Sequence, residues 1–176
     1  MTEITIRDAV PADIPALHRL IESAYRGEAS RAGWTTEADL LDGQRTDPED
    51  LADILADPKQ ALLTAWSDGD LLGCVLIADR GEGTGYFGML SIRPTLQAGG
   101  LGRKLVEAAH AALAERFGAR RVRISVFPQR ETLIAWYQRL GYCLTGATLP
   151  FPYGDPRFGL PKRDDLYFVV MEQELA

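Results

Sequence analysis

The feature that most constrains the fold of this chain is a strand, a glycine-rich turn, a long helix and a second strand in succession. The apolar segment YFGMLSIRP (86–94) favours a strand that Pro94 ends. After QAGGLGRKL (97–105), apolar residues recur at helical spacing as far as Phe117, and a glycine follows. VRISVF (122–127) alternates like a second strand. Because a helix between two strands favours parallel pairing, the order predicts a right-handed βαβ crossover.

The N-terminal part predicts a strand and several helices. TEITIRDAV (2–10) alternates like a strand, and Asp13 is a candidate N-cap for a first helix. We predict a short helix near Glu37–Leu41. A further helix is predicted to begin at Asp47, because Pro48 then occupies its first position.

Further strands and one more helix are predicted in the remaining segments. ALLTAWSDGDLLGCVLIADRG (61–81) indicates a hairpin that turns at Asp68-Gly69, because this pair tolerates positive φ. An apolar stripe from Leu133 to Leu140 predicts a helix. YCLTGATL (142–149) and LYFVVMEQEL (166–175) predict closing strands around a Pro- and Gly-rich loop. The chain therefore predicts an α/β fold with a mixed sheet of about seven strands and helices on both faces.

Composition limits the classes of protein that fit. A chain of 176 residues, 46% of them hydrophobic, suits one domain that spans residues 1–176. A net charge of −6 with scattered arginines argues against a nucleic-acid partner. We predict that Cys74 and Cys143 are core residues without a disulfide, as in a reducing compartment. His18 and His110 lack metal-ligand spacing, so no metal is predicted. Without a segment long enough to span a membrane, we expect no membrane contact and a cytoplasmic location.

The glycines of QAGGLGRKL admit two interpretations. They form either an anion site at a helix N-terminus, with Arg103 and Lys104 at its edge, or a tight turn that merely needs positive φ. Neither the G-x-G-x-x-G dinucleotide fingerprint nor the G-x-x-x-x-G-K-[ST] phosphate loop is present. The spacing that stands here is Gln97-x-x-Gly100-x-Gly102.

This spacing resembles the [Q/R]-x-x-G-x-[G/A] pyrophosphate loop of the GNAT family of N-acetyltransferases. AWYQRLGY (135–142) is similar to that family's Y-x-x-L-G-[F/Y] segment, and the two motifs occur in the family's order. The resemblance covers nearly the whole chain. It implies a mostly antiparallel sheet around a βαβ acetyl-CoA-binding core, and acetyl transfer by direct attack of an amine on the thioester. A small-molecule acceptor is favoured over a protein.

The resemblance also implies a set of cofactor-binding residues. Strand backbone would hold the pantetheine arm and the glycine turn the pyrophosphate, which involves Leu90, Ser91, Ile92, Gln97, Ala98, Gly99, Gly100, Leu101, Gly102, Arg103 and Lys104. Arg130 stands where the family often has an asparagine that contacts the cofactor. Two interpretations of Arg130 stay open, an alternative cofactor contact and a solvated helix start.

Catalytic roles follow from the same resemblance. Tyr137 matches the tyrosine that protonates the departing thiolate, which is chemically sensible for a thiolate leaving into an apolar cleft. Many family members carry a glutamate near the position of Tyr86, where no carboxylate stands here. Glu82 or a chain of waters is left as the candidate base. The missing glutamate also leaves open a non-catalytic acyl-CoA-binding or regulatory protein.

Acceptor recognition in the family comes from two loops, here residues 26–47 and 150–165. Trp34, Tyr153 and Phe158 are candidates for an aromatic wall, and Tyr86 is a further candidate to contact the acceptor. Glu37 and Asp155 are candidates to hold a cation, and Arg45 to hold a carboxylate. Alternatively, Trp34 fills the core and the charges face solvent. A homodimer is also compatible with the sequence, formed by edge pairing of the C-terminal strand.

Overall fold

The computed structural model describes residues 3–26, 30, 36–96, 99–156 and 159–175. Its main sheet has seven strands in the order β1-β3-β4-β5-β6-β9-β7. The strands are β1 Thr5–Asp8, β3 Gln60–Ser67, β4 Asp70–Asp79, β5 Thr84–Ile92, β6 Arg121–Val126, β9 Tyr167–Glu174 and β7 Cys143–Pro150. In this sheet β5 and β6 pair in parallel, and the other five neighbouring pairs are antiparallel. The predicted mixed, mostly antiparallel fold is confirmed.

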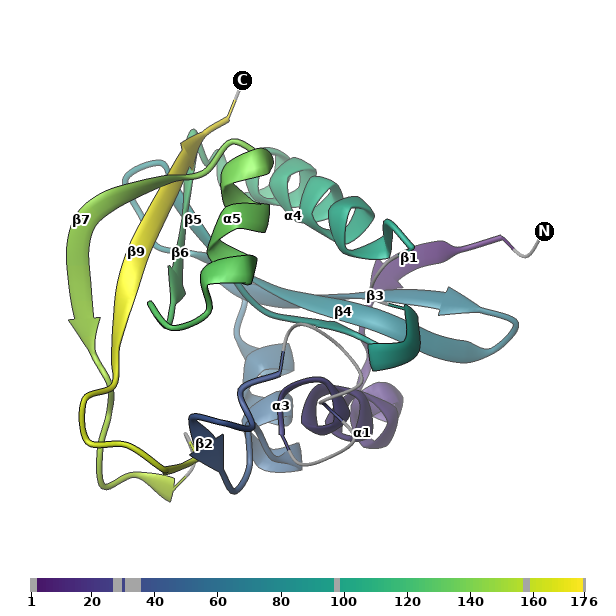
Figure 1. Ribbon diagram of the computed structural model, residues 1–176. Helices are drawn as coiled ribbons and strands as arrows, with labels where there is room; N and C mark the ends of the chain where they lie inside the picture. The colour runs from purple at the N-terminus through teal and green to yellow at the C-terminus, as the bar shows by residue number, and fades with distance from the viewer. Residues whose placement is uncertain (1–2, 27–29, 31–35, 97–98, 157–158, 176) are drawn as a thin grey trace.

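Helices cover both faces of the sheet (Figure 1). The helices are α1 Ile14–Tyr25, α3 Pro48–Ala56, α4 Leu101–Phe117 and α5 Glu131–Arg139, with short 3-10 turns η1 Pro11–Asp13 and η2 Pro94–Leu96. Alternation along the strands divides the core: Leu76 packs with α1 and α3, whereas its neighbour Ile77 packs with α4 and α5. No helix within the described ranges has the length and apolar character needed to cross a membrane.

Several predicted boundaries are confirmed by local contacts. The Asp47 carboxylate accepts a hydrogen bond from the Asp50 backbone N–H at 2.7 Å, so it caps α3. The β3–β4 hairpin turns at Asp68 and Gly69, with φ values of 51° and 80°. Asp13 precedes α1 but does not cap it with its side chain. Its carboxylate instead accepts from the Val10 N–H at 2.8 Å and pairs with a nearby arginine.

The predicted helix at Glu37–Leu41 is wrong. Residues 38–40 form a turn, and Leu41–Asp42 form strand β2, which pairs with β8, Leu160–Pro161. The Lys162 backbone N–H donates to the Leu40 carbonyl at 2.9 Å, and its ammonium donates to the Ala38 carbonyl at 2.6 Å. This pairing of distant segments overrides the local preference and joins the two loops predicted to recognise the acceptor.

Two expectations about the C-terminal strands are also corrected. Cys74 is buried as predicted, but Cys143 is exposed, because it begins the edge strand β7, whose residues are all exposed. The C-terminal strand β9 lies between β6 and β7, so both of its edges are already paired and it offers no edge to a second copy. The homodimer itself stays a prediction.

Candidate active site

The candidate site begins where β5 and β6 separate. The two strands pair only between Thr84–Tyr86 and Arg121–Arg123. Beyond this point the strands bound a cavity of about 440 Å³. Residues from α1, α3, β5, β6, α5 and the intervening loops line it, among them Tyr25, Glu37, Arg45, Tyr86, Leu90, Arg130 and Tyr137. The cavity therefore collects residues that are far apart in the sequence.

A bulge in β5 shapes the backbone at this cavity. Gly88 and Ser91 pair with Leu76 and Cys74, so two residues of β5 lie opposite one residue of β4. Met89, inside the bulge, has a φ of 50°, which costs a non-glycine residue about 1–2 kcal/mol. The buried Ser91 hydroxyl donates to the Met89 carbonyl at 2.9 Å, and the Tyr25 hydroxyl donates to the Leu90 carbonyl at 2.5 Å. Side chains thus hold the bulge in its unusual conformation.

The glycine turn at the start of α4 is open toward solvent. Gly100 occupies the N-cap position with a φ of 82°, and no side-chain hydrogen bond caps the helix. Among the described residues other than its chain neighbours, a Cβ on Gly100 would meet no atom within 4 Å, and one on Gly99 would meet the Leu96 carbonyl at 3.4 Å. Arg103 and Lys104 are exposed beside the turn. The turn therefore has both the space and the free N–H groups that an anion needs.

Packing and positive φ explain the three glycines of this turn only in part. Gly102 is buried within the first turn of α4, and a Cβ there would lie 3.4 Å from the Trp136 ring, an ordinary contact. Positive φ explains the glycine at position 100 but has no bearing on positions 99 and 102. The interpretation as a mere tight turn thus accounts for one of the three glycines. Gln97 and Ala98 lie outside the described residues.

Tyr137 on α5 lines the cavity from the α4 side of the sheet. Its side chain is buried, with ring centroids 5.8 Å from those of Phe87 and Tyr142. Its hydroxyl forms no hydrogen bond with any residue in the described ranges. Burial raises the pKa of Tyr137 well above its ordinary value of 10.0. The hydroxyl is therefore protonated at neutral pH and able to donate a proton.

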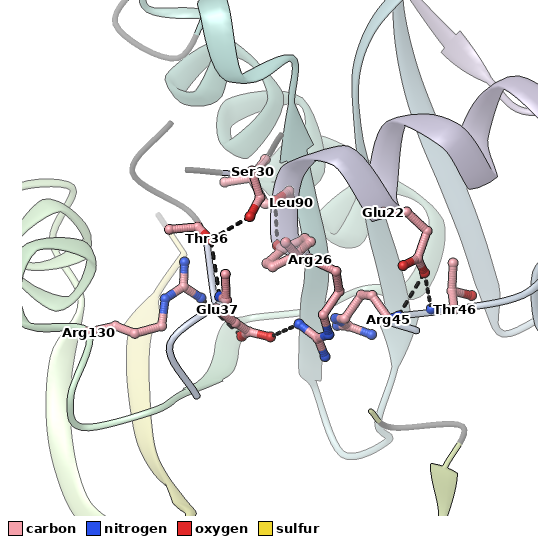
Figure 2. A network of polar contacts seen from close by, with 11 residues as sticks. Glu22, Arg26, Ser30, Thr36, Glu37, Arg45, Thr46, Leu90 and Arg130 are labelled. Atoms are coloured by element: carbon pink, nitrogen blue, oxygen red, sulfur yellow. Dashed lines mark hydrogen bonds and ion pairs between the residues drawn. The ribbon is translucent and has the colours of Figure 1, made fainter. Parts of the chain in front are cut away.

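A buried carboxylate and three arginines form a charged cluster on the same cavity (Figure 2). Glu37 accepts from Arg26 at 2.5 Å and from Arg130 at 3.2 Å, and all three side chains are at most 10% exposed. Burial alone would raise the pKa of Glu37, but the charges of Arg130, Arg26 and the nearby Arg45 lower it below its ordinary value. Glu37 is therefore ionised at neutral pH and holds arginines of its own chain.

The third arginine of the cluster, Arg45, is positioned by its backbone. The Arg45 and Thr46 N–H groups donate to the Glu22 carboxylate at 2.7 and 2.9 Å (Figure 2). The Arg45 guanidinium lies 5.3 Å from the centroid of the Tyr25 ring. Arg130 lies over the same ring at 5.8 Å, so it is not the solvated helix-start residue of the second interpretation. Two of the three guanidiniums therefore lie over the same tyrosine ring.

The structure brings together some predicted acceptor residues and separates others. Tyr86 lines the cavity, with the Arg80 guanidinium 4.6 Å from its ring centroid and its hydroxyl over Gly88, where a Cβ would collide. Tyr153 and Asp155 are not among the lining residues. The Tyr153 hydroxyl instead accepts from the Leu166 N–H at 2.7 Å. Trp34 and Phe158 lie outside the described residues.

The candidate base Glu82 does not reach the cavity. It is exposed in the turn between β4 and β5 and is absent from the lining. Two carboxylates that sequence reasoning missed, Asp50 and Asp53 on α3, do line the cavity. Tyr25 was missed as well, because it continues the apolar spacing of α1 and no sequence signal separates it from a core residue.

Several solved acetyltransferase structures have a fold similar to that of this chain. An acetyltransferase of the GNAT family from Streptococcus pneumoniae has 20% identity and a TM-score of 0.69, covering 98% of this chain and 100% of its own. The ribosomal-protein-S18-alanine N-acetyltransferase from Escherichia coli has 16% identity and a TM-score of 0.71, covering 99% and 95%. YncA from Salmonella typhimurium, solved with its cofactor acetyl-CoA, has 22% identity and a TM-score of 0.70, covering 98% and 94%.

The sequence itself establishes the family. Residues 16–142 match the model of the acetyltransferase (GNAT) family, a span that includes α1, the β5–α4–β6 unit and α5. No curated protein sequence matches the chain. The chain belongs to the GNAT acetyltransferase family, whose cosubstrate is acetyl-CoA.

Proposed function

We propose that this chain is an acetyl-CoA-dependent N-acetyltransferase in which a small-molecule amine attacks the thioester directly. One observation carries the proposal: β5 connects the two parts that such an enzyme needs. Its C-terminal end continues through η2 into the uncapped glycine start of α4, and its splayed residues line the cavity that contains Tyr137. A single strand thus aligns an anion site with a proton donor.

Acetyl-CoA fits the chemistry of these residues. The Gly99 N–H donates to the Leu96 carbonyl at 3.1 Å, so the backbone N–H groups at Gly100–Gly102 would hold the pyrophosphate at the positive end of α4. Arg103 and Lys104 would add charge at the edge. Backbone groups of Leu90, Ser91 and Ile92 would hold the pantetheine arm, because β6 does not pair with this part of β5. The bound cosubstrate supplies the activated acyl group, and the protein supplies alignment.

The remaining chemistry requires one proton to be lost and one to be gained. The neutral amine forms a C–N bond to the thioester carbon, and the C–S bond breaks. The Tyr137 hydroxyl protonates the departing sulfur, a role supported by its position in the cavity lining and by its protonated state at neutral pH. The proton of the amine leaves through water toward Asp50 and Asp53, which line the cavity from α3. No covalent intermediate on the enzyme is needed.

The shape of the cavity supports a small acceptor. Arg45, Phe127, Phe151 and Phe168 line it, and the β2–β8 pair joins the loops that carry its outer wall. A volume of about 440 Å³ lies in the range of ordinary small-molecule sites. A non-catalytic protein with the same cavity would bind acetyl-CoA without releasing CoA.

Two measurements test the proposal. Acetyl-CoA and CoA should raise the melting temperature, and acetyl-CoA with a panel of amines should release free CoA. Tyr137→Phe should lower kcat about 100-fold while the affinity for acetyl-CoA changes little. Tyr167→Phe, an exposed tyrosine outside the cavity lining, is the matched control. Full stabilisation by acetyl-CoA without CoA release from any amine would favour the non-catalytic alternative.

A further inference from the structure

The charges around Glu37 do not balance. Both carboxylate oxygens of Glu37 are engaged, Oε1 by Arg26 and Oε2 by Arg130. Arg45 lines the same cavity, yet its guanidinium forms no hydrogen bond or ion pair with any residue in the described ranges. Among the described residues, four arginines and three carboxylates line the cavity, including Asp50 and Asp53, which gives these side chains a net charge of +1. Arg45 is therefore the guanidinium of this cluster that a ligand oxyanion would pair with.

Contacts of its backbone and of its side chain fix the position of Arg45. Its backbone N–H donates to the Glu22 carboxylate, and its guanidinium lies over the ring of Tyr25. The Tyr25 hydroxyl in turn donates a hydrogen bond to the Leu90 carbonyl in β5. Asp50, a carboxylate near this loop, accepts from the Thr46 hydroxyl at 2.7 Å, and its charge acts on Arg45 without a direct ion pair. The Arg45 side chain is only partly buried, and none of its nitrogens is a buried unpaired atom among the described residues. Its N–H donors therefore stay open to the cavity, where a ligand oxyanion would accept from them.

The site faces the acceptor rather than the pyrophosphate. Arg45 precedes α3 and Arg26 follows α1, and both helices pack on the face of the sheet opposite to α4. Helix α4 lies on one face of the sheet and α1 and α3 on the other (Figure 1), so the glycine turn and the segment that carries Arg45 belong to opposite faces. Between these faces, β5 and β6 do not pair beyond Tyr86. Acetyl-CoA whose pyrophosphate is bound at the start of α4 would not occupy the Arg45 guanidinium, which would then be available to the acceptor.

We propose that Arg45 binds an oxyanion of the acceptor, so that the acceptor is an amine that also carries a carboxylate or phosphonate group. The inference rests on the proposed acetyl transfer and adds the chemical class of the acceptor. The planar fork of a guanidinium binds such a group through two parallel hydrogen bonds. The Tyr25 ring behind Arg45 fixes the orientation of that fork.

Matched amines test the class of the acceptor. α-Amino acids are compared with the amines that lack the carboxylate, for example phenylalanine with phenethylamine and leucine with isoamylamine, and with the aminophosphonic acids. Release of CoA from acetyl-CoA is measured for each. Binding is measured in parallel as the shift in melting temperature of the CoA-saturated protein at about 10 mM amine. The acids should be acetylated or bound, and their decarboxylated partners should be neither.

Variants of Arg45 test whether this residue causes the preference for amines that carry an acidic group. Arg45→Met should raise KM for the acidic acceptor about 10- to 100-fold, with little change in kcat and none in KM for acetyl-CoA. It should also leave the melting temperature of the free protein unchanged or higher, whereas a structural arginine would lower it. Arg45→Lys should recover only part of the affinity, because an ammonium lacks the fork. Arg19→Gln, an exposed arginine on α1, is the control.

The outcomes separate this inference from the proposed function. Acetylation of uncharged amines at rates equal to those of their acidic partners overturns the inference and leaves N-acetyl transfer intact. Absence of both turnover and binding across the acids, in a protein that acetyl-CoA stabilises, also overturns it. A protein that acetyl-CoA does not stabilise contradicts the proposed function itself.

Discussion

Replacement of Gly100 by alanine separates backbone strain from loss of an anion site. Gly100 has a φ of 82°, and Gly118, at the other end of α4, has a φ of 65°. A Cβ at either position would meet no atom within 4 Å in the part of the chain that the structure describes, chain neighbours aside. Each alanine should therefore cost the same left-handed strain, about 1–2 kcal/mol. For a domain of this length, each kcal/mol lowers the melting temperature by about 2–4 °C.

The two variants should differ in acetyl-CoA affinity alone. The open space at Gly100 is where the pyrophosphate would lie, so its methyl group should weaken binding at least about 10-fold, or 1.4 kcal/mol. The open space at Gly118 is at the negative end of the helix, so Gly118→Ala should bind acetyl-CoA like the parent chain. Urea unfolding of the free protein and calorimetric titration with acetyl-CoA give both numbers. Equal affinities in the two variants would refute the assignment of the glycine turn.

Three further predictions concern the cavity. Glu37→Gln should lose about 3 kcal/mol of stability at neutral pH, measured by urea unfolding, because Arg26 and Arg130 lose their buried counter-charge. The folded pKa of Glu37 lies below its ordinary value of 4.5, so its contribution is complete above pH 4.5 and lost as the pH falls through the folded pKa. The variant should therefore lose less stability than the parent chain on acidification, and equal acid sensitivity would contradict this. Tyr25→Phe should cost about 1–3 kcal/mol in the same assay, since the Leu90 carbonyl loses its donor; unchanged stability would refute that role. For Tyr137, kcat should show no decline from loss of the acid as the pH approaches 10.0, because burial raises its pKa well above this value; a decline that Tyr137→Phe abolishes would oppose the assignment.

Local sequence signals were enough to predict most of the fold. The β5–α4–β6 unit follows from periodicity, from Pro94 after the strand and from Gly118 after the helix, and each of these acts within a few residues. The helix predicted at Glu37–Leu41 is wrong because β2 exists only through its pairing with β8, which lies far along the chain. The burial predicted for Cys143 is wrong for a similar reason, since nothing local marks β7 as an edge strand.

The residues of the candidate site also fall into two groups, those that local sequence signals predict and those that only tertiary contacts reveal. Tyr137, Arg45 and Glu37 were predicted from motif and loop position, and all three line the cavity. Glu82 was selected for its closeness in sequence to β5, but the β4–β5 turn places it outside. Tyr25 has the spacing of an ordinary helix core residue, so its role under two arginines emerges only from the contact between α1 and β5.

A crystal structure of the protein with acetyl-CoA tests the central claim most directly. We predict that the pyrophosphate lies on the backbone N–H groups at Gly100–Gly102, and that the thioester lies between β5 and β6 with its sulfur within hydrogen-bond distance of the Tyr137 hydroxyl. A pyrophosphate bound away from the start of α4, or a sulfur out of reach of Tyr137, would contradict the assignment of this site.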